Sequence, residues 1–184
     1  MRLPLSPTLL LALFAPLLAP SLTAQTRSDT KENSRAGETA SDLAPADRRF
    51  ITRSTRLAME AIRLSRLAAA RATDPGIRAL ARTIADTREA SSSSLLRLAA
   101  SKEVVLPLDD DPNLTRWLEK QGAEFDHDYL DEMNDALHDI RELLQDRIDE
   151  PHDPDIARFA REQLPFAQEH LRRTEELLRQ RQSS

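Results

Sequence analysis

Cysteine is absent from the 184-residue sequence, and the three glycines occur at isolated positions. Without cysteine the chain cannot form disulfides, thiolate zinc sites or iron–sulfur clusters, and it cannot use a cysteine nucleophile. Without a glycine-rich segment it lacks the kind of loop that surrounds a nucleotide phosphate. Several large classes of enzyme are therefore excluded.

A cluster of positive charge is also missing. The chain has 26 Lys and Arg against 31 Asp and Glu, which gives a formal net charge of −5 at pH 7, and the basic residues are scattered. A nucleic-acid-binding domain needs a basic patch that faces the phosphate backbone. The charge pattern therefore predicts that nucleic acid is not a partner.

The most apolar stretch lies at the N-terminus. Met1 and Arg2 precede an apolar segment from Leu9 to Leu18, and small residues follow it up to Ala24. This order is typical of a signal peptide cleaved after Ala24. The segment is shorter than the roughly 20 apolar residues of a membrane-spanning helix, although a retained N-terminal anchor is an alternative. We predict a signal peptide over 1–24 and a periplasmic or secreted protein with no integral membrane span once mature.

Residues 25–44 contain few large apolar side chains and many Ser, Thr, Asp, Glu and Arg. Such a segment cannot bury enough apolar surface to offset the entropy lost on ordering. We predict a disordered polar linker here, followed by one folded domain over 45–180.

In the predicted domain, apolar residues recur three or four positions apart, which is the spacing of amphipathic helices. We predict long helices over about 46–72, 75–102, 123–150 and 154–180. Asp74 with Pro75 and Asp153 with Pro154 each supply an N-cap followed by proline at the first helical position. Pro165 is expected to kink the last helix, because proline has no N–H to donate.

The connections between these helices differ in length. The first and last pairs are joined by a few residues, so each pair should form an antiparallel hairpin. Residues 104–122 make a much longer connection, with a short helix that holds Leu114, Trp117 and Leu118. We predict that Trp117 packs on the flank of the bundle. The fold class is therefore all-α: a ferritin-like four-helix bundle with one long crossover connection carrying a short helix.

Two charged residues fall on predicted apolar faces. Glu60 follows Leu57 by three residues and precedes Leu64 by four, and Arg88 lies four residues after Ile84. An unpaired charge in a protein core costs several kcal/mol. We therefore expect a buried polar pair between Glu60 and Arg88. The alternative is that both long side chains extend to the rim of the bundle.

His170 lies at the edge of the last helix's apolar stripe, and we predict a core histidine. In a second hypothesis Glu60 and His170 are metal ligands, with Glu132 or Glu169 as further carboxylates. Bundles with two bridged metal ions use two Glu-x-x-His pairs, and only Glu124 to His127 has that spacing here. We expect no cofactor, with an iron, manganese or zinc ion as the alternative. The other histidines are predicted on solvated faces: His127, His138 and His152.

Several short motifs occur in an order that is similar to a known family. They are Phe50, Met59-Glu60, Leu80-Ala81, Leu106-Pro107, Phe125-Asp126, Tyr129-Leu130, Leu164-Pro165 and His170-Leu171. Over about residues 47–178 the sequence resembles the exported bacterial family called domain of unknown function 4142. The resemblance implies a ferritin-like four-helix domain of exported or envelope-associated proteins, without an established biochemical role.

Members of that family typically have a Glu in the first helix and a His in each of the other three. Glu60 and His170 match this set, whereas Arg88 and Leu137 stand at the other two positions. A guanidinium that stays charged cannot ligate a metal, and leucine has no donor atom. Our hypothesis is that Arg88 supplies the positive charge that a metal would supply in relatives and keeps Glu60 ionised in the core.

These observations predict an exported, non-enzymatic helical-bundle protein with an envelope- or stress-related interaction role. Its partner is an envelope protein or a second copy of the chain. One alternative is a ferritin-like metal-binding protein or oxidoreductase with a degenerate metal site. Another is peripheral binding to a membrane or cell wall through the Arg-rich last helix, which the acidic net charge disfavours.

Overall fold

The computed structural model describes residues 43–106 and 115–183 of the chain. These residues all belong to one compact unit. The predicted signal peptide, nearly all of the predicted linker, and Leu114 lie outside the described residues. Within the described ranges the chain forms helices and no strand, so the predicted all-α class is confirmed.

The helices are α1 (Pro45–Arg71), α2 (Pro75–Ser101), α3 (Thr115–Leu118), α4 (Gly122–Asp149) and α5 (Pro154–Gln182). Each long helix begins and ends within two residues of its predicted bounds. Both predicted caps are present: Asp74 Oδ1 accepts from the N–H groups of Gly76 and Ile77, and the Asp153 carboxylate caps α5 in the same way. None of the described helices is both long and apolar enough to span a membrane.

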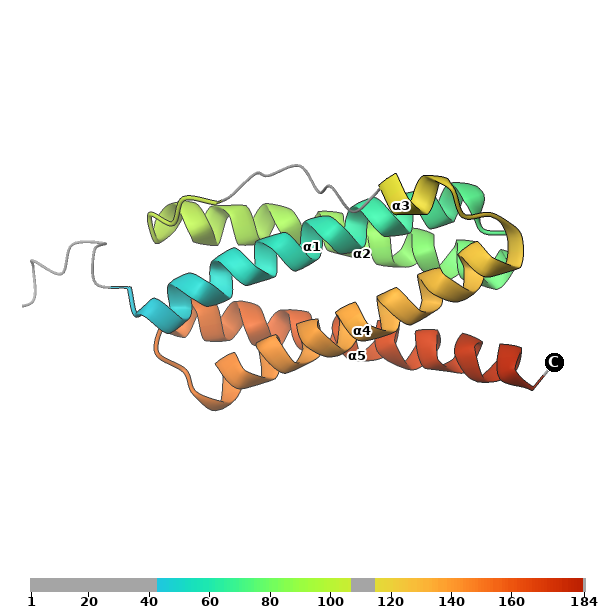
Figure 1. The fold of residues 1–184 in the computed structure, drawn as a ribbon. Helices are drawn as coiled ribbons and strands as arrows, with labels where there is room; N and C mark the ends of the chain where they lie inside the picture. Colours follow the sequence, from blue (N-terminus) through green and yellow to red (C-terminus); the bar gives the residue numbers. More distant parts are fainter. Residues whose placement is uncertain (1–42, 107–114, 184) are drawn as a thin grey trace, which may run out of the picture. The chain divides into compact units, whose positions relative to one another are not determined.

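The four long helices form a bundle in which α1 packs along α2 and α4, and α5 packs along α4 and α2 (Figure 1). Ion pairs mark which ends meet. Lys102, just after α2, contacts Asp153 just before α5, while Asp47 at the start of α1 contacts Arg147 near the end of α4. Neighbouring helices are therefore antiparallel, and α2 ends at the opposite end of the bundle from the start of α4. This arrangement requires the predicted long crossover between α2 and α4.

The core lies along the inner faces of all four long helices. Burying each large apolar side chain contributes about 1.5–3 kcal/mol. Most of the apolar residues that recur three or four positions apart are buried, and those at the edges of the helical stripes are only partly buried: Leu67, Ala136, Ile148, Leu164 and Leu178. The largest apolar side chains with at most 2% exposure are Phe50, Ile51, Ile77, Leu80, Ile84, Phe125, Tyr129, Leu130, Met133, Leu137 and Ile156.

Trp117 on α3 packs on the bundle as predicted. Its side chain is buried and meets the ring of Phe125 edge-on, with 5.9 Å between ring centroids. The Arg71 guanidinium lies over the Phe125 ring and donates to the carbonyl oxygens of Trp117, Leu118 and Lys120. These contacts hold the chain that enters α4 against the end of α1.

Helix α5 continues through Pro165. Because proline cannot donate a backbone hydrogen bond, the carbonyl of Arg161 one turn earlier lacks its usual helical partner. The predicted kink at this position remains a prediction.

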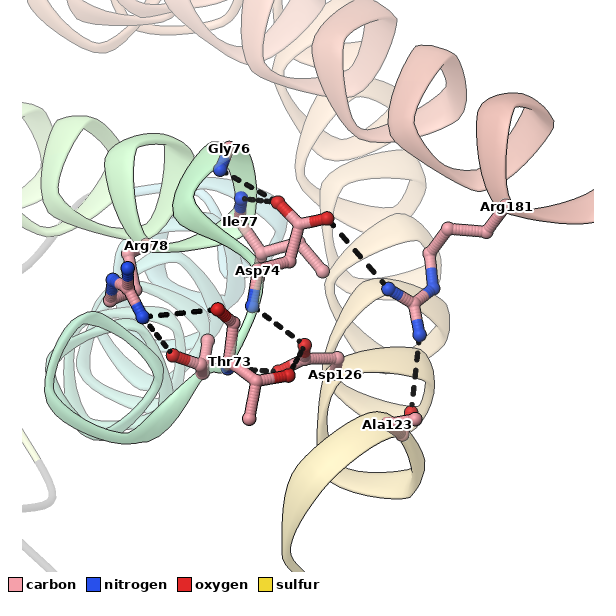
Figure 2. Close-up of polar contacts among 9 residues, drawn as sticks. Thr73, Asp74, Gly76, Ile77, Arg78, Ala123, Asp126 and Arg181 are labelled. Carbon is pink, nitrogen blue, oxygen red and sulfur yellow. Dashed lines mark hydrogen bonds and ion pairs between the residues drawn. The ribbon is translucent and has the colours of Figure 1, made fainter. Parts of the chain in front are cut away.

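A buried carboxylate fixes the α1–α2 turn to α4 (Figure 2). Asp126 accepts hydrogen bonds from Thr73 N at 2.9 Å, Thr73 Oγ1 at 2.5 Å and Asp74 N at 2.9 Å. Arg181 of α5 reaches the same end, with Asp74 Oδ2 at 3.9 Å and the carbonyl oxygen of Ala123 at 3.3 Å. Four helix ends are thus joined through polar contacts, and we assign this cluster to stability.

A second buried contact joins helices at the opposite end of the bundle. The Asp47 carboxylate accepts from Arg147 Nη1 at 2.8 Å, and both side chains are buried. Arg147 Nη1 also lies 2.9 Å from His152 Nδ1. Paired charges therefore fix both ends, while the middle of the bundle contains charged and polar groups of a different kind.

Candidate functional site

Arg88 lies in the middle of α2 and faces the core. It follows Ile84 and Ala85 on the buried stripe of the helix and is itself only 5% exposed. Helical spacing explains this position, because residues three and four apart share one face. The predicted inward orientation of Arg88 is confirmed.

The Arg88 guanidinium has no hydrogen-bond acceptor for two of its nitrogens in the described part of the chain. Nε and Nη2 are buried and lack a partner there. Burial lowers the pKa of Arg88 to about 10, so the side chain still carries its positive charge at neutral pH. Leaving a buried charge uncompensated costs several kcal/mol. Arg88 is therefore the least satisfied charged group in the described core.

The predicted pair between Glu60 and Arg88 is not formed. Glu60 Oε1 instead accepts from Arg56 Nη1 at 3.2 Å, one turn earlier on α1, and its side chain is 40% exposed. Glu60 occupies the edge of the apolar stripe, and its flexible side chain reaches water and Arg56 without being desolvated. The hypothesis that Arg88 holds Glu60 ionised in the core is therefore wrong.

His170 of α5 is a core histidine, as predicted. It is 3% exposed, and its Nδ1 has no hydrogen-bond partner in the described structure. Burial, followed by the positive charge of Arg88, lowers the pKa of His170 to about 4. The imidazole is therefore neutral at pH 7 and lies within electrostatic reach of the Arg88 cation.

The residues of the metal hypothesis do not assemble into a binding site. In residues 43–106 and 115–183, no group of three or more His, Asp or Glu side chains is placed to hold one metal ion. Glu132 pairs with Arg116 and Glu169 pairs with Arg172, and both carboxylates are about half exposed. Glu124, His127 and His138 also lie toward the surface. The donor set around His170 therefore does not fit a bundle metal centre.

Sequence reasoning missed a small cavity next to Arg88. It has a volume of about 20 Å³ and is lined by Arg88, Ser54 of α1 and Gln163 of α5, together with apolar side chains from all four long helices. Ser54 Oγ and Gln163 Oε1 are buried and, like the Arg88 nitrogens, have no partner among the described residues. The spacing of residues could have indicated that Ser54 and Gln163 face the core. Ser54 lies four residues before the buried Ala58, and Gln163 lies four residues after the buried Phe159.

A second hollow lies on the outside of the bundle, between the start of α1 and the end of α4. This groove has a volume of about 1020 Å³, and Leu43, Pro45 and Leu143 contribute apolar surface to it. Its charged lining residues are Arg48, Arg49, Arg53, Arg56, Asp146 and Arg147.

Three of the groove arginines form ion pairs: Arg53 with Asp139, Arg56 with Glu60, and Arg147 with Asp47. Arg48 and Arg49 are exposed and form no ion pair with the described residues. The groove therefore combines apolar surface with two available guanidinium groups.

Comparison with known proteins establishes the family. The family model "Domain of unknown function (DUF4142)" matches residues 32–177. The chain belongs to the DUF4142 family. The predicted resemblance is confirmed, and the match covers all of α1 to α4 and most of α5. Among curated proteins, no sequence matches the chain.

Several solved structures have a similar fold, and two of them are described as DUF305 proteins. A DUF305 fragment from Deinococcus radiodurans is 14% identical, with a TM-score of 0.61 over 74% of this chain and 97% of the other. A DUF305 protein from Streptomyces coelicolor, described as secreted, is 19% identical, with a TM-score of 0.61 over 74% and 93%. CopM in a silver-bound form is 16% identical, with a TM-score of 0.61 over 73% and 96%. At these identities the likeness establishes a shared helical-bundle fold.

Proposed function

We propose that the protein is an exported, non-enzymatic interaction domain that holds an acidic segment of an envelope protein in the groove beside α1. The observation that carries this proposal is the pair of exposed arginines, Arg48 and Arg49, which form no ion pair with the described residues and lie at a groove that also offers apolar surface. Guanidinium groups bind carboxylates through two parallel hydrogen bonds. An acidic peptide with apolar residues between its carboxylates complements such a groove.

Export is supported by the N-terminal sequence pattern, which is typical of a cleaved signal peptide. The structurally similar Streptomyces coelicolor protein is described as secreted, which agrees with this proposal.

Metal binding receives less support. The similar protein CopM binds silver, and soft cations of this kind prefer thiolate and thioether ligands. This chain has no cysteine, and its three methionines are Met1 in the predicted signal peptide, Met59 and the fully buried Met133. The donor chemistry therefore favours the interaction domain over a carrier of soft metal ions.

The groove can be tested with a photo-crosslinking amino acid in place of Thr52, introduced in bacteria that export the full chain. The matched control site is Thr83 on α2, because each threonine Oγ1 donates to the carbonyl four residues earlier on an exposed turn. We expect a crosslinked partner peptide rich in Asp and Glu from Thr52 and none from Thr83.

Charge reversal makes this test specific. The double substitution Arg48→Glu with Arg49→Glu should abolish the Thr52 adduct, because it replaces both exposed guanidinium groups with carboxylates. The control pair, Arg82→Glu with Arg161→Glu, changes net charge equally at two other exposed arginines and should leave the adduct intact. An adduct that survives reversal of Arg48 and Arg49 would overturn the proposal. An adduct with a second copy of the chain would also overturn it.

A further inference from the structure

We propose that the cavity beside Arg88 binds a monovalent anion of about the size of chloride. This proposal is independent of the groove and concerns the interior of the bundle. It rests on three observations: an uncompensated buried cation, unsatisfied hydrogen-bonding groups around one cavity, and the size of that cavity.

The charge of Arg88 requires an opposite charge. Arg88 forms no ion pair within the described part of the chain. Glu60, the partner predicted from the sequence, pairs with Arg56 at the surface instead. Burial alone accounts for the lowered pKa of Arg88, with no carboxylate acting to raise it. A water molecule would satisfy hydrogen bonds but leave the charge uncompensated, whereas an anion does both.

The polar groups at the cavity suit such an anion. Arg88 Nε–H and Nη2–H and the Ser54 hydroxyl are donors without partners in the described structure. The buried Gln163 atom without a partner is the acceptor Oε1, so the side-chain amide must rotate to turn its NH₂ group toward an anion. The guanidinium, the hydroxyl and the amide come from α2, α1 and α5, so a bound anion would link three helices.

The size of the cavity and its lining determine which anions it can hold. A volume of about 20 Å³ accommodates one water molecule or one monatomic ion. Phosphate and sulfate, with four oxygens each, are too large for it. The rest of the lining is mostly apolar, and its two other polar residues, Ser91 and Ser92, donate their hydroxyls to the carbonyl oxygen of Arg88. Apolar surroundings strengthen the attraction between a cation and an anion.

Thermal unfolding tests this proposal directly. We expect the Tm of the unmodified protein to rise by about 4 °C, and then level off, when sodium gluconate is replaced by sodium chloride at constant ionic strength. Gluconate is too large for the cavity. Arg88→Met keeps a long side chain but removes the charge, and it should abolish the chloride-dependent rise. Arg82→Met, at an exposed arginine of the same helix, should keep the full rise.

Bromide provides a second readout on the unmodified protein, which does not depend on a variant that folds. Crystals grown with sodium bromide should show an anomalous peak within hydrogen-bonding distance of Arg88 Nε or Nη2. A cavity that contains only water would overturn the proposal. An equal effect of chloride on the Tm of Arg88→Met and the unmodified protein would also overturn it.

Discussion

At the scale of single residues, His170 makes the interior sensitive to pH. It is the only buried histidine within the described residues, and burial with the nearby Arg88 charge lowers its pKa to about 4. An unfolded chain would protonate the same imidazole near its ordinary pKa of about 6.5. The folded and unfolded states therefore bind different numbers of protons between these two values.

The consequence is a loss of stability on acidification. Between pH 6.5 and about 4 the unfolded state binds more protons at His170, so the free energy of unfolding falls as pH falls, by about 3 kcal/mol in total. Urea unfolding measured at several pH values checks this prediction. His170→Leu should flatten the curve over that window, whereas His138→Leu, at a half-exposed position, should leave it unchanged. Identical curves for both variants would refute the assignment.

Glu60 and Arg88 show what sequence spacing can predict at this scale. Periodicity places both residues toward the core, yet only Arg88 is buried. Arg88 is surrounded along its helix by buried Ile84 and Ala85, while Glu60 lies at the edge of its stripe with Arg56 one turn away. The spacing of residues along the sequence determines which face of a helix each residue lies on. The direction of a long side chain depends on local partners and solvent, which the pattern does not specify.

At the scale of helices, Asp126 links one hairpin to the other. Its carboxylate is fully buried and accepts three hydrogen bonds from Thr73 and Asp74 in the α1–α2 turn. Removing the carboxylate leaves the donors of the turn without their acceptor. Each buried polar group left unsatisfied costs about 1–3 kcal/mol.

We therefore expect Asp126→Ala to lower the free energy of unfolding by about 3 kcal/mol, measured by urea denaturation. Asp131→Ala is the matched control on the same helix, because its carboxylate is exposed and faces only His127. The control should change stability by less than about 0.5 kcal/mol. Equal effects of the two substitutions would show that the Asp126 contacts contribute nothing to stability.

Local sequence signals predicted the helices themselves well. The Asp-Pro pairs at α2 and α5 define where each helix begins, because cap and proline act within one turn. The role of Asp126 was not predicted, since its partners lie 52 and 53 residues away in the sequence. The buried pair of Asp47 and Arg147, 100 residues apart, was missed for the same reason.

At the scale of the whole molecule, the lengths of the connections predicted the topology. Short links make the pairs α1–α2 and α4–α5, and the long link places α1 beside α4 and α2 beside α5 (Figure 1). The groove and the cavity depend on side chains from helices that are distant in sequence. Hydrophobic periodicity could not locate them.

A shared fold does not establish a shared site. The DUF305 structures and CopM have similar bundles at 14% to 19% identity, and one fold can support unrelated functions. In this chain the middle of the bundle is built around a buried guanidinium, a neutral histidine and a small cavity. We propose that the cavity beside this guanidinium holds an anion.

Metal content tests most directly the central claim that the donor set in the middle of this bundle does not form a metal centre. The protein should be purified after export, without refolding or exposure to a chelator, and analysed by elemental mass spectrometry. The account predicts iron, manganese, zinc and copper far below one ion per chain, in the unmodified protein and in Glu60→Ala with His170→Ala alike. Near-stoichiometric metal that disappears in the double variant would contradict it and establish a metal site in the bundle.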